Sequence, residues 1–348
     1  MTNSFDPFVD WIEERSHREP FFSGTFWLLF STLSDPDLLS ALRLDSRPLI
    51  PVPLSQGSTT VTVRKRTGRT LQAIFNLLPL TTNRVRILFS LDKPGKALRP
   101  MYHLLGRTKG TVHLFPIGLP LFKSCSRLSS HFSFADTHIV RGVSYPSRPS
   151  EGGADINLSP GNATTFFAKL EEEKRVLKTA RLQVPTSEHS CCEFTVGRPG
   201  YVSYHKGDFR SLLKLITEKL PTALSDSIKP FERARGNFVQ FRFADPLFVD
   251  RANYQIVLEA LSRLPRTSLA LIHTNPYFHA TLTNYEDGGE FDIFITGHST
   301  IHIQGLPEAS PASFLRIQNG LTDQFQDASI SLEQTHQYDL RQLMEGQV

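Results

Sequence analysis

Three short segments near the C-terminal end alternate between apolar and polar residues, and they constrain the fold more than any other part of the sequence. They are residues 278–285, 291–296 and 300–304, and the turn Glu286-Asp-Gly-Gly289 separates the first two. Such alternation is typical of strands with one buried face, and Asp-Gly is a strong hairpin signal. We therefore predict an antiparallel meander. Its apolar face consists of Phe278, Ala280, Leu282, Phe291, Ile293, Ile295, Ile301 and Ile303.

Segments with helical and strand periodicity alternate along the rest of the chain. The pattern predicts helices over 71–78, 97–106, 166–182, 209–220, 254–264 and 312–325. It predicts strands over 61–65, 85–89, 111–115, 131–135, 138–140, 194–196, 201–204 and 237–243, and 268–274 leads into the meander. This order favours an α/β domain with a partly parallel sheet, followed by an α+β domain. The predicted fold class is α/β plus α+β, with two mixed-sheet domains behind a helical N-terminal segment.

Changes in composition suggest where the domains begin and end. We predict a helical segment over 1–45, a linker rich in Pro and Ser over 46–60, a basic α/β domain over 61–182, an α+β domain over 183–330 and a polar tail over 331–348.

The composition excludes several classes of protein. The longest apolar run, Phe26–Phe30, is far shorter than the roughly 20 residues that span a bilayer. The first 20 residues carry acids where a signal peptide needs a basic start. Three cysteines are too few for a disulfide framework or a Cys-rich zinc finger, and no nucleotide-binding signature is present. The sequence therefore predicts a cytoplasmic protein without membrane contact, metal or cofactor.

The net charge of +4 hides a strong asymmetry. Residues 61–150 contain 15 basic and 2 acidic residues, whereas residues 241–348 contain 6 basic and 13 acidic residues. A block of this charge attracts a polyanion by releasing its condensed counterions. The candidate nucleic-acid-binding residues are Arg64, Lys65, Arg66, Arg69, Arg84, Arg86, Lys93, Lys96, Arg99, Arg107, Lys109, Lys123 and Arg127. The alternative is that the acidic C-terminal segment packs against this block and neutralises it.

The other face of the predicted meander is polar and offers a second candidate site. Its candidate catalytic residues are His279, Asp292 and His302, because two histidines and a carboxylate on one sheet face can share a proton or hold a metal. The alternative is an ordinary solvated sheet face, since one side of an antiparallel sheet commonly faces water. No spacing here matches a known metal motif.

Residues 61–182 resemble a half-unit of the phospholipase D-like superfamily in the order of their predicted elements. The order is strand, helix, the strand VRILFS, the helix LRPMYHLL, the strand TVHLF, and a hairpin around HFSFAD. The catalytic motif of that family is His, any residue, Lys, four residues, Asp. In the nearest match, which runs from His131 to Asp136, Ser133 replaces the lysine, the aspartate comes two residues early, and no second copy follows. The resemblance therefore implies a catalytically inactive domain that is retained for binding.

The leading hypothesis is a nucleic-acid-binding accessory protein without catalytic activity of its own. The sequence does not distinguish DNA from RNA as the partner. One alternative is a metal-assisted hydrolase or phosphodiesterase that uses the polar face of residues 278–304. Another is a protein–protein interaction module, which binds a partner chain or forms a homo-oligomer.

Overall fold

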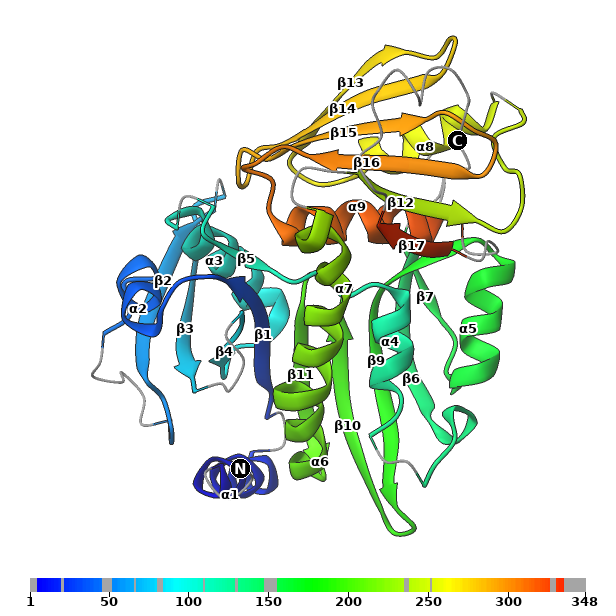
Figure 1. Ribbon diagram of the computed structural model, residues 1–348. Helices are drawn as coiled ribbons and strands as arrows, with labels where there is room; N and C mark the ends of the chain where they lie inside the picture. The colour runs from blue at the N-terminus through cyan, green and yellow to red at the C-terminus, as the bar shows by residue number, and fades with distance from the viewer. Residues whose placement is uncertain are drawn as a thin grey trace. The chain divides into compact units, whose positions relative to one another are not determined.

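The computed structural model describes residues 5–19, 22–45, 52–65, 67–79, 84–108, 110–128, 131–146, 155–234, 238–250, 252–325 and 330–334. The chain divides into two compact units, which Figure 1 shows as ribbons. The first unit consists of Met1–Tyr145, Asp155–Leu170 and Leu177–Ser225. The second unit consists of Pro146–Ala154, Glu171–Val176 and Asp226–Val348.

The first unit is built on an 11-stranded sheet in the order β2-β3-β4-β1-β11-β10-β9-β6-β7, with β5 beside β1 and β8 beside β6. Its strands are β1 (Gly24–Ser31), β2 (Gly57–Arg64), β3 (Thr70–Leu78), β4 (Val85–Ser90), β5 (Val112–Leu114), β6 (His138–Pro146), β7 (Ile156–Leu158), β8 (Gly161–Asn162), β9 (Arg175–Ser187), β10 (Ser190–Gly197) and β11 (Tyr201–Gly207). Helices and sheets together confirm an α+β class. Every strand pair whose register is defined in the described part is antiparallel, so the predicted partly parallel sheet is wrong. Short turns join β2 to β3, β9 to β10 and β10 to β11, and such turns permit only antiparallel neighbours.

Helices cover both faces of this sheet at β1. The helices of the first unit are α1 (Asp6–Arg18), α2 (Asp35–Ala41), α3 (Pro94–Gly106), α4 (Leu119–Cys125), α5 (Ala163–Glu172) and α6 (Phe209–Lys214), and α6 continues through a π-helical turn (Leu215–Lys219) into α7 (Leu220–Ala234). On one face, the ring of Phe26 lies 6.2 Å from that of Phe8 in α1 and 5.8 Å from that of Phe209 in α6. On the other face, Trp27 belongs to a buried cluster with Met101 of α3.

The burial of β1 on both faces corrects the prediction of an all-helical segment over 1–45. Every residue of Gly24–Ser31 is buried. A strand buried on both sides loses its apolar–polar alternation, so its sequence cannot be told from that of a buried helix by periodicity. Helices α1 and α2 of this segment flank the strand on either side in the sequence.

Two other segments that were predicted as helices contain strands. Leu71–Leu78 lies in β3, where Phe75, Leu77 and Leu78 are all buried, and its apolar residues happen to fall at helical spacing. The helix predicted over 166–182 ends at Glu172, and β9 begins at Arg175. Between them Lys174 has a φ of +48°, a left-handed conformation that ends the helix.

The second unit contains a six-stranded antiparallel sheet in the order β13-β14-β15-β16-β12-β17. Its strands are β12 (Phe238–Phe243), β13 (Thr267–His273), β14 (Phe278–Asn284), β15 (Glu290–Ile295), β16 (Thr300–Gly305) and β17 (Ile330–Gln334). The predicted meander and its apolar face are confirmed, because Ala280 pairs with Ile293, which pairs with Ile303, and all three are fully buried. Residues of α8 (Ala252–Ser262) and α9 (Pro311–Gln324) pack into the same core.

The predicted domain boundaries differ from the observed division. The boundary expected between residues 182 and 183 falls inside β9, which runs from Arg175 to Ser187 without interruption. In the predicted linker, Gly57–Thr60 already belongs to β2, and in the predicted tail, Ser331–Gln334 pairs with β12. These segments are polar or rich in Pro and Ser because β2 and β17 stand at the ends of the two strand orders, where polar residues and proline are tolerated.

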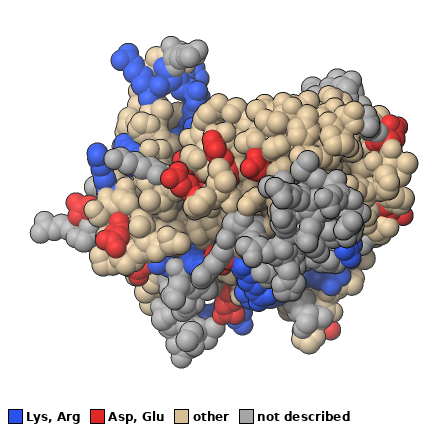
Figure 2. Space-filling model, turned by 45° about the horizontal axis from the view of Figure 1, so that its top comes forward, with Lys and Arg blue, Asp and Glu red and all other residues tan. Residues whose placement is uncertain are grey.

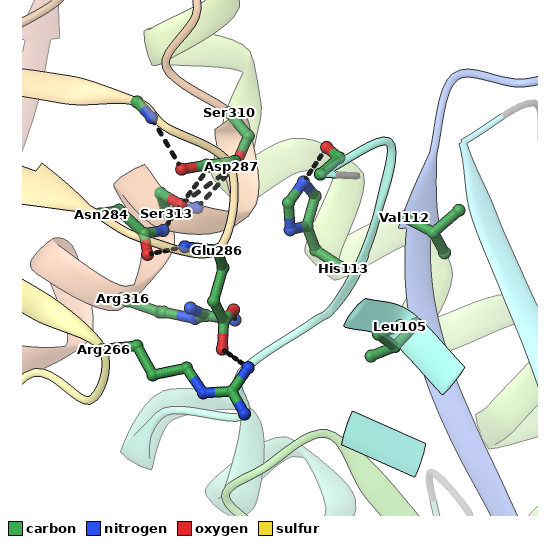
Figure 3. A network of polar contacts seen from close by, with 12 residues as sticks. Leu105, Val112, His113, Arg266, Asn284, Glu286, Asp287, Ser310, Ser313 and Arg316 are labelled. Carbon is green, nitrogen blue, oxygen red and sulfur yellow. Dashed lines mark hydrogen bonds and ion pairs between the residues drawn. The ribbon is translucent and has the colours of Figure 1, made fainter. Parts of the chain in front are cut away.

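A buried polar network fixes the hairpin turn between β14 and β15 to α9 (Figure 3). Asp287 accepts a 2.6 Å hydrogen bond from Ser313, and Asn284 also donates to the Ser313 hydroxyl. Glu286 forms an ion pair with Arg316, and the Arg266 Nη1 atom lies 3.6 Å from its other oxygen. The side chains of Glu286 and Arg316 are only 13% and 12% exposed.

We expect Glu286→Gln to lower the free energy of unfolding by about 3 kcal/mol, because removing one partner of a buried ion pair leaves the other charge uncompensated. Urea denaturation followed by circular dichroism measures the change. The matched control is Glu308→Gln on an exposed loop, which should change the free energy by less than about 0.5 kcal/mol. Equal effects of the two substitutions would contradict this account.

Candidate nucleic-acid interface

Strands β2 and β3 extend beyond the rest of the sheet as a two-stranded ribbon. β2 pairs with β3 from Gly57 and Leu77 to Arg64 and Thr70, whereas β3 pairs with β4 only over Asn76–Leu78. The β-branched run Thr59–Val63 favours the extended conformation. At the tip, Lys65 N donates a 2.7 Å hydrogen bond to Arg69 O, and Gly68 adopts the φ of +81° that the turn requires.

The two faces of the ribbon differ sharply. On the inner face, Val61 and Ala73 lie opposite each other and are buried in the cluster that contains Met101 of α3. On the outer face, two directly paired sets of polar side chains are exposed: Thr62 with Gln72, and Arg64 with Thr70. The alternation of strand side chains therefore holds the inner face in the core and leaves the outer face free to contact a ligand.

The tip of the ribbon carries cations that no described acid neutralises. Arg64 and Arg69 are exposed and Lys65 is half-buried, and within the described residues their side chains form no ion pair or hydrogen bond. The sequence contains no Asp or Glu between Asp45 and Asp92. Figure 2 shows a group of Lys and Arg side chains at the upper left of the view, with Asp and Glu side chains set apart from it. The predicted residue Arg66 lies outside the described residues.

The remaining predicted cations are spread over β4, α3 and α4. Arg84, Lys93, Lys96, Arg99 and Arg127 are exposed, and Arg107 and Lys123 are half-buried. The Lys123 ammonium lies 5.8 Å from the ring centroid of Phe167, and Lys109 lies outside the described residues. The strands and helices thus do not bring all these cations to one place. Among the described residues, three of the predicted cations, Arg64, Lys65 and Arg69, lie around the turn at the ribbon tip.

Arg86 is a correction to the predicted interface. It is 8% exposed, and its Nη2 atom lies 3.0 Å from Asp35 Oδ1 and 3.2 Å from the carbonyl oxygen of Leu33. Arg86 lies in β4, which pairs with the central strand β1, and its guanidinium binds Asp35 in the first turn of α2. Its charge serves the fold and is not offered to a ligand.

The start of α3 contains the tripeptide Pro94-Gly-Lys96, whose lysine was a predicted phosphate contact. Lys96 Nζ lies 2.5 Å from Asp92 Oδ1, four residues earlier. The other Asp92 oxygen accepts a 3.2 Å hydrogen bond from Ile74 N. This carboxylate neutralises Lys96 and places a negative charge where a phosphate would approach the helix N-terminus, so Lys96 is a weaker candidate than the ribbon tip.

A second polar cluster, which the periodicity of the sequence does not indicate, lies on β9, β10 and β11. Glu193 is 5% exposed and pairs with Arg181 and with Lys206, whose Nζ atom lies 3.3 Å from Glu193 Oε2. His205 Nε2 lies 2.8 Å from the Thr195 hydroxyl. Burial, with help from nearby cations, lowers the pKa of His205 to about 4, so the imidazole is neutral at pH 7.

A β-bulge explains why this cluster escaped detection. The register shifts between Glu193 and Phe194, so that Lys206 faces Glu193 while Tyr204 faces Phe194, and His205 is the inserted residue. Alternation alone would have placed His205 and Lys206 on opposite faces. The cluster has one net positive charge, because Arg181 and Lys206 outnumber Glu193 and His205 is neutral.

The polar face of the meander brings together only two of the three predicted catalytic residues. His279 Nε2 lies 3.3 Å from Asp292 Oδ1, which also accepts a 2.7 Å hydrogen bond from Thr281. His279 in β14 and His302 in β16 lie on opposite sides of β15, where Phe294 pairs with both of them and separates them. Over the described ranges, no three His, Cys, Asp or Glu side chains are grouped so that they could hold a metal ion.

His302 belongs to an aromatic cluster on the outer face of this sheet. It is 3% exposed, and the ring of Phe238 lies 5.9 Å away. Its Nδ1 atom is buried and has no hydrogen-bond partner among the described residues. Burial lowers the pKa of His302 to about 4, so that the ring is a neutral, packed side chain at pH 7.

We expect His302→Leu to flatten the acid dependence of stability. In the unfolded chain His302 takes up a proton near pH 6.5, and in the folded protein only near pH 4. The contribution of neutral His302 to the free energy of unfolding is therefore complete above pH 6.5, and it is lost as the pH falls towards 4. His302 should therefore contribute a loss of about 2 kcal/mol between pH 7 and pH 5, from 1.36 kcal/mol for each pKa unit. Urea denaturation at both pH values measures the loss, and an unchanged loss in the variant would contradict the assignment.

The segment that resembles the phospholipase D-like motif is not the predicted strand over 131–135. Phe134–Asp136 forms a single 3-10 turn. The Asp136 carboxylate accepts hydrogen bonds from the backbone N–H and the hydroxyl of Ser133, at 2.7 and 2.8 Å, and these bonds lower its pKa. A local capping interaction thus uses the aspartate, and the alternation of Phe132 and Phe134 that favoured a strand is accidental.

Comparison with protein-family models and with curated proteins finds no match for this chain. In the part of the chain that the structure describes, no helix has both the length and the apolar character needed to cross a membrane.

Proposed function

We propose that this protein binds nucleic acid as an accessory factor, through the cations at the tip of the β2–β3 ribbon. The observation that supports the proposal is the arrangement of Arg64, Lys65 and Arg69, which surround one turn and have no ion pair among the described residues. A phosphate backbone approaching this tip releases counterions without first breaking a salt bridge. Arginine also forms bidentate contacts with phosphate oxygens.

Binding of labelled DNA and RNA, each single- and double-stranded, at about 50 and 200 mM salt tests the proposal. A nucleic-acid-binding protein should lose affinity steeply over this range. Incubation with Mg²⁺ or Mn²⁺ in parallel shows whether the substrate is cleaved, which would favour the hydrolase alternative. Absence of binding to all four at low salt would refute the proposal and would indicate that the basic block is neutralised within the protein.

The edge strand β13 favours a second candidate function, association with another copy of this chain. Leu271 and Ile272 are 47% and 53% exposed, and a register shift between Leu271 and His273 leaves both side chains at the surface of an edge strand. Such an edge can pair with a strand from another molecule. Light scattering should then show dimers that Ile272→Lys converts to monomers, whereas a monomeric wild-type protein would refute this candidate.

A further inference from the structure

We propose that the ligand of the ribbon is B-form double-stranded DNA, and that the outer face of the ribbon enters the major groove. This inference rests on the proposed nucleic-acid binding and specifies both the ligand and the mode of contact. It commits the ribbon to two tasks. Lys65 and Arg69 at the tip contact phosphates, and the paired polar side chains Thr62 and Gln72, with Arg64 and Thr70, contact base edges.

The dimensions of the ribbon fit that groove. The ribbon is two strands wide, and neighbouring strands lie about 4.8 Å apart. The four pairs from Val61–Ala73 to Arg64–Thr70 extend beyond the last pair of β3 with β4, and their three steps of about 3.3 Å span about 10 Å. The major groove of B-DNA is about 12 Å wide and 8.5 Å deep, and it admits a two-stranded β-ribbon. The inner face of the ribbon is packed on α3, so that the ribbon is held rigidly and presents one defined face.

The side chains of the outer face are of the kinds that distinguish base pairs. Arginine donates two hydrogen bonds to the O6 and N7 atoms of guanine, glutamine pairs with the N6 and N7 atoms of adenine, and threonine contacts either base or the thymine methyl group. Directly opposed residues in an antiparallel pair have Cβ atoms about 5 Å apart. Thr62, Gln72, Arg64 and Thr70 therefore form a compact two-by-two array, and none of them has a side-chain partner in the described part of the chain.

Other nucleic acids fit this surface less well. Binding of single strands relies on aromatic side chains on which the bases stack, and among the described residues of the first unit no Phe, Tyr or Trp side chain is exposed. Double-stranded RNA has a deep, narrow major groove that side chains cannot read. A protruding ribbon without aromatic residues at its tip therefore favours duplex DNA over both.

Fluorescence anisotropy tests the inference with a 20-base-pair DNA duplex, an RNA duplex of the same sequence, and each single DNA strand. A further DNA duplex with 7-deazaguanine in place of guanine lacks the N7 acceptor in the major groove. We expect at least tenfold tighter binding to duplex DNA than to the other forms, and about tenfold weaker binding to the 7-deazaguanine duplex. The variant Thr62→Ala/Gln72→Ala should lose about tenfold in affinity for duplex DNA with an unchanged salt dependence, because it removes no charge.

The matched control for this variant is Ser40→Ala/Thr164→Ala, which changes two exposed polar residues on α2 and α5. It should bind as the wild type does. Equal, salt-dependent binding to all forms of nucleic acid would overturn the major-groove inference and leave the proposed function intact. Failure to bind any of them would overturn both. Thermal melts of each variant separate a binding defect from a folding defect.

Discussion

The triple variant Arg64→Ala/Lys65→Ala/Arg69→Ala is expected to bind nucleic acid two to three orders of magnitude more weakly than the wild type near 100 mM salt. Each phosphate contact contributes about 0.9 to the slope of log K against log salt on duplex DNA, so Lys65 and Arg69 contribute about 1.8. The lost base contact of Arg64 lowers the affinity by about a further order of magnitude. Titrations at four or more salt concentrations measure the affinity and the slope together. The slope is the more specific readout, because a general loss of folded protein would lower the affinity and leave the slope unchanged.

A control with the same change in charge separates the position of these cations from their number. Lys169, Lys214 and Lys229 are exposed and lie on the helices α5, α6 and α7, where alanine is well tolerated. Their triple alanine variant lowers the net charge by the same three units. If it weakened binding as much as the ribbon variant did, binding would depend on overall charge and the ribbon would have no special role.

Gly200→Ala is expected to lower the free energy of unfolding by more than about 4 kcal/mol or to prevent folding, which is at the extreme end of single substitutions. Gly200 has a φ of +99°, and an added Cβ atom would lie 2.1 Å from the carbonyl oxygen of Phe115. The backbone there cannot move freely, because Gly200 O accepts a 2.9 Å hydrogen bond from Leu28 N in the central strand. A shift of Gly200 that relieved the clash would therefore disturb its hydrogen bond to Leu28 in β1.

The matched control for this substitution is Gly95→Ala in the first turn of α3. No heavy atom lies within 4 Å of its added Cβ atom, so the substitution meets open space. Alanine is the better helix former by about 0.5–1 kcal/mol, so this variant should be slightly more stable than the wild type. Urea denaturation measures the free energy of unfolding of both variants. A Gly200→Ala protein as stable as Gly95→Ala would refute the close approach of the Gly200 backbone to Phe115 O.

Periodicity predicted the elements that have one buried and one exposed face. The meander, α3 and α9 lie where their patterns indicated. It misassigned the strands β1 and β3, which are buried on both faces along all of β1 and along residues 75–78 of β3. It could not predict the antiparallel order of the first sheet, because β1 pairs with β11, whose residues lie almost 180 positions later.

The candidate interface was predictable only in part, because charge can be read from the sequence but burial and strand pairing cannot. The density of cations between residues 61 and 127 identified the region, and the tip residues Arg64, Lys65 and Arg69 were among those named. Charge alone did not show that Arg86 is buried against Asp35, or that Asp92 neutralises Lys96. Nor did it indicate Thr62 and Gln72, since uncharged residues become candidates only once β3 is known to be a strand that faces β2.

The central place of β1 also has a consequence for the synthesis of the chain. This apolar strand leaves the ribosome before its partner β11, which follows about 170 residues later. At roughly 5–20 residues per second, β1 waits on the order of 10–35 s with one edge unpaired. During that interval the nascent chain presents Phe26-Trp-Leu-Leu-Phe30 as an aggregation-prone segment, and we expect a chaperone to bind there until β11 emerges.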